Sequence, residues 1–227
     1  MNELKQSIQD KLRNLAKAHG KDFQMILTRY FQERILYRIS VSPFTNNFCL
    51  KGGALLYAIS EEMGRPTLDI DFLAIGIQRD QKKVEAIFRK ICSRPYPLDD
   101  IEIQADGISV KEIMEHKRYI GIRVKIPISL GNMRQILTID IGFSDQVVPA
   151  PVKMTYPTLL DMEEPVVIAY SSVSVIAEKF EAMIDLGEMN SRMKDFYDVW
   201  QLLISGNIDK EDLKKAIKKH SKFAKRL

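Results

Sequence analysis

The sequence has few of the features that mark membrane, secreted or low-complexity proteins. Its 227 residues contain no apolar run long enough to cross a bilayer, and the opening Met-Asn-Glu-Leu-Lys lacks the basic and then apolar layout of a signal peptide. The two cysteines, Cys49 and Cys92, are far apart and lack metal-ligand spacing, so we expect buried free thiols. No internal repeat is present. We therefore expect a cytoplasmic protein with no membrane partner.

The sequence also lacks a strong excess of positive or negative charge. The net charge is +4, which is mild, and charged residues of both signs, 28% of the chain, are interspersed, so the total alone does not establish a nucleic-acid partner. The exception is the segment from Lys210 to Leu227, which holds eight Lys or Arg against two acidic residues. It fits either a solvated basic helix or a surface that contacts phosphates. The 45% of hydrophobic residues suffices for one large domain or two modest ones.

The spacing of apolar residues predicts a sheet in the middle of the chain and helices at both ends. Spacings of three and four predict two helices in the first forty residues, broken near Gly20. Strands are predicted at residues 68–75, 101–105, 119–128 and 135–141, with amphipathic helices at 81–91, 194–203 and 210–222. A proline-studded stretch, 149–165, precedes a helix capped by Ser171–Ser174. This order predicts an α/β or α+β fold, with the core in residues 1–150 and a linker and helical region in 151–227.

Two carboxylates stand two residues apart on the first of these strands. Asp69 and Asp71 leave the same face, with Cα atoms roughly 6 to 7 Å apart, while Ile70 and Phe72 face the other way. Two partly buried negative charges need a cation, and Mg²⁺ takes carboxylate oxygens, water and substrate phosphates. The alternative is a chance pair at a sheet edge, where both carboxylates face water.

Glycines and a further acid accompany this pair. Lys51, Gly52 and Gly53 precede a predicted helix, where backbone N–H groups and the helix dipole favour a phosphate, although a tight strand-to-helix turn would have the same sequence. Asp140 interrupts an otherwise apolar strand and needs a partner there. A metal ion shared with Asp69 and Asp71, or a nearby Lys or Arg, would serve.

Together these features resemble the nucleotidyltransferase superfamily. There, a glycine motif opens a helix and holds the triphosphate, and acids on later strands hold two divalent ions. The match narrows in five segments that are similar to the AbiEii/AbiGii family, nucleotidyltransferase-like toxins of type IV toxin–antitoxin and abortive-infection systems. In chain order, the segments are Phe48–Leu56, Arg65–Phe72, Ile139–Asp145, Ala177–Ala182 and Ser191–Asp198.

The resemblance implies a polymerase-beta-like core with a mixed sheet and a set of site residues. It implies that Asp69 and Asp71 are metal ligands and that Asp140 is a third. The implied ion is Mg²⁺, or alternatively Mn²⁺. Lys179 becomes the lysine that contacts nucleotide phosphates and Asp195 the late catalytic aspartate. The nucleotide-binding residues it implies are Lys51, Gly52, Gly53, Thr67, Lys179, Arg192 and Lys194.

Without the family, some of these residues have plainer explanations. A lysine beside an apolar helical stripe, as Lys179 is, usually extends to water. The crowding of Arg192, Lys194, Asp195 and Asp198 also fits an ordinary ion-pair cluster. One position departs from the superfamily, because many members have Gly-Ser where this chain has Gly52-Gly53, which removes a hydroxyl from the phosphate site.

The resemblance implies transfer of a nucleoside monophosphate from an NTP to an acceptor. In characterised relatives the acceptor is the 3′ end of tRNA, and this transfer blocks translation. The resemblance also implies a cognate antitoxin from the same operon. Nothing in the sequence names tRNA. Two alternatives are transfer to a protein or small molecule, and a nucleotide- or RNA-binding module without chemistry; Asp69, Asp71, Lys179 and Asp195 together argue against the second.

Overall fold

The computed structural model describes residues 3–60, 67–115, 119–143, 147–187, 193–205 and 208–224. Its helices are α1 (Glu3–Ala18), α2 (Phe23–Ser40), α3 (Gly52–Ser60), α4 (Gln81–Cys92), α5 (Ser172–Leu186), α6 (Met193–Ser205) and α7 (Lys210–Ala224), with a short 3-10 helix at Ala105–Gly107. The strands are β1 (Phe48–Lys51), β2 (Asp69–Ala74), β3 (Glu102–Ile103), β4 (Ser109–Glu115), β5 (Tyr119–Leu130), β6 (Met133–Phe143), β7 (Val152–Thr155) and β8 (Val166–Ala169). In this part of the chain, no helix has the length and apolar character that crossing a membrane requires.

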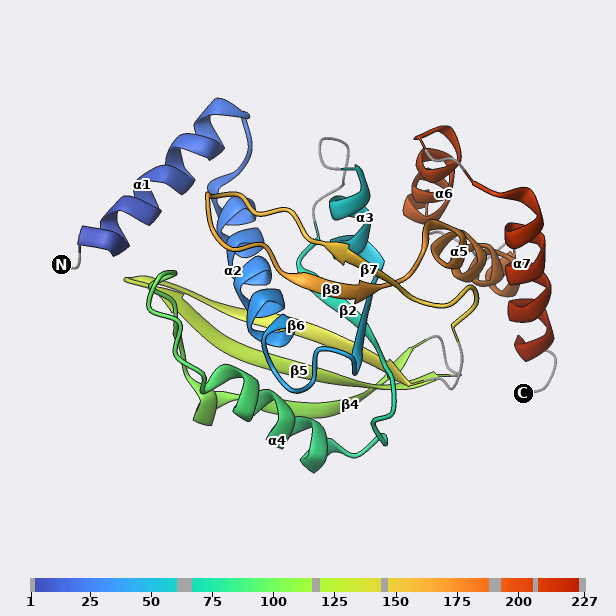
Figure 1. Cartoon of the computed structure of the whole chain (residues 1–227), viewed down its shortest axis with the longest axis horizontal. Coiled ribbons are helices and arrows are strands. Elements are labelled where there is room, and N and C mark those ends of the chain that lie inside the picture. Colours follow the sequence, from blue (N-terminus) through green and yellow to red (C-terminus); the bar gives the residue numbers. More distant parts are fainter. Residues whose placement is uncertain are drawn as a thin grey trace. The chain divides into compact units, whose positions relative to one another are not determined.

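The strands form one mixed sheet of eight strands. Its order is β3-β5-β6-β2-β1-β8-β7, and β4 pairs with β5. The pair β2–β6 is parallel, whereas β1–β2, β5–β6 and β4–β5 are antiparallel (Figure 1). Strands far apart in sequence therefore become neighbours, and β6 brings Asp140 beside β2.

The two faces of the sheet differ in polarity because side chains alternate along each strand. One face is apolar and closed, with Ile70 and Phe72 of β2 almost fully buried. On β5 and β6 the residues of this face are also buried: Ile122, Val124, Ile126, Leu137, Ile139 and Ile141. The other face carries the polar residues of the same strands, which are only half-buried. The sheet thus supplies a rigid apolar backing for a polar surface.

Helix α2 is buried on nearly all sides and anchors its charges internally. Arg38 is bound through both terminal nitrogens to the carboxylate of Asp99, at 2.6 and 3.1 Å, and both side chains are buried. Glu33 accepts from Arg29 at 2.9 Å, yet burial raises the pKa of this carboxyl to about 7. Buried pairs of this kind fix geometry more than they add stability.

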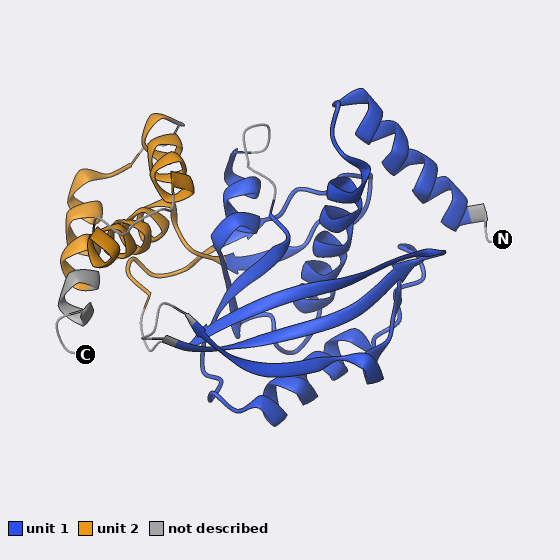
Figure 2. Ribbon diagram, turned by 180° about the vertical axis from the view of Figure 1, so that it is seen from behind, with its two compact units in different colours: residues 1–144, 153–168 blue, residues 145–152, 169–227 orange. Residues whose placement is uncertain are grey.

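The chain divides into two compact units, coloured separately in Figure 2. Unit 1 comprises residues 1–144 and 153–168, and unit 2 comprises residues 145–152 and 169–227. Unit 2 has a small apolar core of its own, in which Val173 and Ala177 of α5 meet Ala216 of α7.

The predicted α/β class and mixed sheet are confirmed, and so are most predicted elements. The predicted strand 101–105 is only two residues long, at Glu102–Ile103, and β1, β4, β7 and β8 were not expected. Strand β7 lies within the proline-studded stretch, where prolines are compatible with its place at the edge of the sheet. The cap of α5 is confirmed, since the Ser171 side chain accepts from the Ser174 N–H at 3.1 Å.

Candidate active site

Strand β2 presents its two carboxylates on the half-buried polar face of the sheet. Asp69 and Asp71 alternate with the buried Ile70 and Phe72, as the sequence predicts. In the parallel pair, Asp71 stands directly opposite Asp140 of β6. Neighbouring strands lie about 4.8 Å apart, so the structure brings the three predicted acids to one patch of unit 1.

Cations flank these acids within the same row of the sheet. Directly paired residues in neighbouring strands point to the same face. Lys51 of β1 is opposite Asp71, and Arg123 of β5 is opposite Asp140. The row across β1, β2, β6 and β5 therefore reads Lys51, Asp71, Asp140, Arg123, with two negative charges enclosed by two positive ones.

The Arg123–Asp140 contact is bidentate. Nε of Arg123 donates to Oδ1 of Asp140 at 2.7 Å, and Nη2 donates to Oδ2 at 2.6 Å. Arg123 is 34% exposed and Asp140 is 15% exposed at the side chain. The hydrogen bonds to Asp140 raise the pKa of the Arg123 guanidinium, and the charges of Asp69 and Asp71 act in the same direction. Arg123 thus lies in the field of all three acids.

Gly52 allows the Asp71 carboxylate to reach the start of α3. Its φ is +67°, and a Cβ at this position would lie 1.9 Å from Oδ2 of Asp71. Only glycine fits such a position, because any side chain would collide with the carboxylate and would also strain the backbone. The strand-to-helix turn that the sequence allowed is therefore present, and it also lies against an acid.

Gly53 makes a similar close approach to Thr67. A Cβ on Gly53 would lie 2.6 Å from Oγ1 and 2.7 Å from Cβ of Thr67. The Thr67 hydroxyl donates to the backbone oxygen of Asp69 at 3.2 Å, so it stands next to the acids. The absence of serine at position 53 has a steric reason here, because Thr67 fills the space that the serine Cβ would need.

The carboxylates of Asp69 and Asp71 fit a hard divalent cation. Both supply oxygen ligands on one face. The Asp71 carboxylate lies in a cradle at Gly52, which is the space that a Cβ on residue 52 would fill. Among the residues that the structure describes, no group of three acid, His or Cys side chains has the geometry to hold a metal ion. Asp140 is paired with Arg123, which is the kind of partner that the sequence allowed as the alternative to a metal ion.

In unit 2, Lys179 is bound by two aspartates. Its Nζ lies 2.8 Å from a carboxylate oxygen of Asp195 and 2.8 Å from one of Asp198. The three side chains are 13%, 6% and 4% exposed, respectively. The lysine head does not extend to water, as a lysine beside an apolar stripe usually would. Helices α5 and α6 therefore share a nearly buried cation–dicarboxylate cluster.

The two other residues of unit 2 that were predicted to bind the nucleotide are Arg192 and Lys194. Lys194 lies on α6 and its side chain is exposed. Arg192 lies outside the described residues. The contact of Asp198 with Lys179 was not predicted from the sequence, and neither was a role for Arg123. A signal for Arg123 existed, because it occupies a polar-face position of a predicted strand while Asp140 needed a cation.

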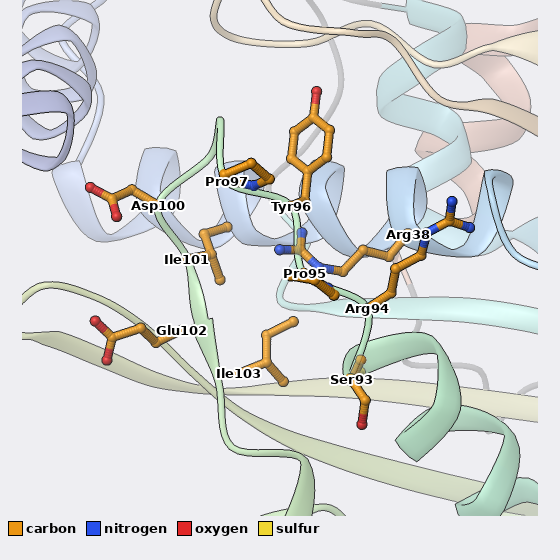
Figure 3. Close-up of a pocket in the computed structure, with 11 residues that line it drawn as sticks. Arg38, Ser93, Arg94, Pro95, Tyr96, Pro97, Asp100, Ile101, Glu102 and Ile103 are labelled. Atoms are coloured by element: carbon orange, nitrogen blue, oxygen red, sulfur yellow. The ribbon is translucent and has the colours of Figure 1, made fainter.

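A separate cavity of about 310 Å³ in unit 1 contains none of the predicted site residues. It is lined by Arg38 near the end of α2 and by residues 92–97 and 100–103 (Figure 3). Asp100 and Glu102 lie on one side of it and Arg94 on the other (Figure 3). Burial raises the pKa of the Cys92 thiol to about 12, so this thiol is protonated and unreactive at neutral pH.

We expect substitution of Gly52 to damage the site more than substitution of another left-handed glycine. Gly20 also has a positive φ, +58°, but a Cβ there meets nothing within 4 Å. Gly20→Ala should therefore lower the free energy of unfolding by only about 1 kcal/mol, from backbone strain. Gly52→Ala adds the collision with Asp71 and should cost clearly more in urea titrations. Equal losses in the two variants would show that Asp71 does not occupy the cradle.

Two solved structures share the fold of this chain. The crystal structure of a candidate nucleotidyltransferase from H. pylori matches with a TM-score of 0.50 and 15% identity, covering 90% of this chain and 79% of that one. The crystal structure of an antigenic nucleotidyltransferase-like protein from Paracoccidioides brasiliensis matches with a TM-score of 0.50 and 12% identity, covering 85% of this chain and 86% of that one. At these identities the likeness shows a nucleotidyltransferase-like fold. No curated protein matches the chain significantly.

The family comparison covers most of the sequence. The family described as nucleotidyl transferase AbiEii toxin, type IV TA system, matches residues 34–226. This range includes the acids of β2 and β6, the glycines before α3 and the lysine–aspartate cluster of unit 2. The chain therefore belongs to the AbiEii family of type IV toxin–antitoxin systems and is a nucleotidyltransferase.

Proposed function

We propose that this toxin uses a divalent metal ion, Mg²⁺ or Mn²⁺, to transfer a nucleoside monophosphate from an NTP to the 3′ end of an RNA, with tRNA as the acceptor. The observation that carries the proposal is the placement of Asp69 and Asp71 on one face of β2, with Asp71 against Gly52 at the start of α3. Oxygen ligands beside a helix start suit a metal–triphosphate complex.

In the proposed reaction, the acceptor hydroxyl oxygen bonds to the α-phosphorus of the NTP and the α–β phosphoanhydride bond breaks. Pyrophosphate leaves, and the hydroxyl proton passes to a carboxylate or to water. A divalent ion, when bound, supplies charge neutralisation at the phosphates. Asp69 and Asp71 hold it, and backbone N–H groups at Gly52 and Gly53 face the phosphates.

The remaining site residues keep proposed roles. Lys51 and Thr67 lie next to the acids within unit 1 and are proposed to contact the nucleotide. Lys179 and Asp195 keep the roles that the family resemblance gives them, a phosphate-contacting lysine and a catalytic acid. Arg192 and Lys194 are proposed as further phosphate contacts. The type IV family also implies an antitoxin partner, which we propose is encoded in the same operon.

Support for an RNA acceptor comes from exposed cations. Helix α7 buries Ala216 and turns Lys210, Lys214, Lys215 and Lys218 outward. Lys214 lies 4.0 Å from Glu211 and Lys215 lies 3.2 Å from Asp212, but such exposed pairs are weak. A basic helix of this kind suits a phosphate backbone.

Removing one metal-binding carboxylate should abolish transfer. Purified protein, α-labelled NTPs supplied one at a time, Mg²⁺ or Mn²⁺ and total RNA should give labelled RNA, and EDTA should prevent it. Asp71→Asn should reduce the rate by about a thousandfold or more, because a metal-held charge stabilises the transition state by several kcal/mol. A matched control is Asp106→Asn, whose fully exposed carboxylate pairs with Arg89 at the surface. Transfer by Asp71→Asn at the rate of this control would refute the metal role.

The chemical nature of the acceptor can be tested on the RNA itself. Periodate oxidises the 3′ cis-diol, so tRNA treated with it should accept no label, whereas tRNA carried through a mock treatment should accept it fully. Gel separation before and after ribonuclease digestion shows where the label lies. Label that resists ribonuclease and migrates with protein, or that appears in a small molecule, would favour those acceptors instead.

A further inference from the structure

The surroundings of Asp140 leave little room for a metal ion as its partner. Both of its carboxylate oxygens accept short hydrogen bonds from Arg123, at 2.7 and 2.6 Å. The two residues are direct partners in the antiparallel β5–β6 ladder, so the backbone itself holds them together. A bidentate arginine–carboxylate pair is among the strongest side-chain contacts in proteins.

Arginine cannot relieve this pairing by losing its proton. The guanidinium stays protonated at any physiological pH, and the hydrogen bonds to Asp140 raise the pKa of Arg123 further. A divalent ion bound to Asp140 would therefore lie beside a permanent positive charge. On β2, Asp69 is opposite the neutral Thr138, whereas Asp71 is opposite Asp140 on one side and Lys51 on the other, so neither is opposite an arginine. The bidentate arginine contact therefore concerns Asp140 and leaves the two acids of β2 as the metal ligands of the proposed function.

The charged row also places Arg123 close to the acids of β2, where a second positive charge could contact the triphosphate. The row continues from Arg123 to Lys111 of β4, so its order is Lys51, Asp71, Asp140, Arg123, Lys111. The pair with Asp140 uses two of the five N–H donors of the guanidinium. The Arg123 side chain is 34% exposed, so solvent and ligands can reach it.

We propose that Asp140 is a positioning residue for Arg123 and that the Arg123 guanidinium binds a phosphate oxygen of the NTP, in place of a second metal ion. The inference rests on the proposed function and refines it. Asp69 and Asp71 hold one metal ion, Asp140 fixes the plane of the guanidinium, and Arg123 supplies a second, permanent positive charge to the triphosphate. Arginine suits this task because its planar fork binds a carboxylate and a phosphate oxygen at once.

The experiment separates metal binding from nucleotide binding. Mn²⁺ affinity and stoichiometry are measured by electron paramagnetic resonance, and the affinity for a non-hydrolysable α,β-methylene NTP is measured by calorimetry with Mn²⁺ present. Wild type should bind one Mn²⁺ per chain. Asp71→Asn should lose it, whereas Asp140→Asn should keep Mn²⁺ affinity within roughly threefold, less than the loss of one charge-assisted contact would cause.

Arg123→Ala should show the opposite pattern. Its Mn²⁺ affinity should be unchanged or higher, while its affinity for the NTP analogue falls roughly tenfold or more, the loss expected for a hydrogen bond to a charged group. Arg123→Lys should restore part of this affinity. The difference in affinity between wild type and Arg123→Ala should be smaller for a nucleoside monophosphate than for the triphosphate analogue. Arg134→Ala is the control, because it removes an exposed cation from the same face about 20 Å along β6 and should change neither affinity.

Thermal melting shows which variants fold. If Asp140→Asn or Arg123→Ala does not, the double variant Asp140→Asn/Arg123→Gln leaves a neutral amide pair and should bind Mn²⁺ normally and the analogue weakly. Loss of Mn²⁺ by a folded Asp140→Asn, or by this double variant, would overturn the inference while leaving nucleotide transfer intact as the function. An unchanged affinity of Arg123→Ala for the NTP analogue would likewise overturn the inference and leave the proposed function intact. Wild type that binds neither Mn²⁺ nor analogue and transfers no label would refute the proposed function itself.

Discussion

Electrostatic repulsion between carboxylates is the constraint on which the candidate active site depends. Asp69 and Asp71 share one face of β2, and Asp140 joins them from the parallel neighbour β6. Three acids at such separations raise each other's energy unless cations lie among them. Lys51 and Arg123 lie on either side of Asp71 and Asp140 in the row. The proposed metal ion completes the neutralisation, so the chemistry of the site follows from the charges that the fold brings together.

The fold supports this concentration of charge by making the opposite face of the sheet apolar. Ile70 and Phe72 of β2 and Ile139 of β6 are almost fully buried, so the backbone that carries the acids cannot shift easily. Next to Lys51, Gly52 lets the Asp71 carboxylate meet the start of α3 without a steric clash. In unit 2, by contrast, a single lysine, Lys179, contacts the two carboxylates of Asp195 and Asp198 within a nearly buried cluster. Each unit thus contains its own group of acids and cations.

Local patterns in the sequence were sufficient for the parts of the site that depend on neighbours along the chain. Alternation predicted the common face of Asp69 and Asp71, and the glycines predicted the start of α3. Contacts between strands that are far apart in the sequence, such as Asp71 of β2 opposite Asp140 of β6, were beyond reach because no local signal fixes their register. Arg123 was missed although the need of Asp140 for a cation was recognised. The predicted strands ended at residue 128 and began again at residue 135, so the two-residue turn at Gly131 that sets the register of β5 and β6 was not identified. The short strands β1, β7 and β8 gain their structure from pairing in the sheet, and segments of four residues carry little periodicity.

Membership of the AbiEii family makes the chain a nucleotidyltransferase, and the geometry of β2 identifies the residues that we propose for the metal. Anomalous diffraction from crystals grown with Mn²⁺ and a non-hydrolysable NTP tests this assignment most directly. The account predicts one strong manganese peak about 2.1 Å from carboxylate oxygens of both Asp69 and Asp71, with the triphosphate bound to the same ion. Nucleotide density whose manganese lies away from both carboxylates would contradict it.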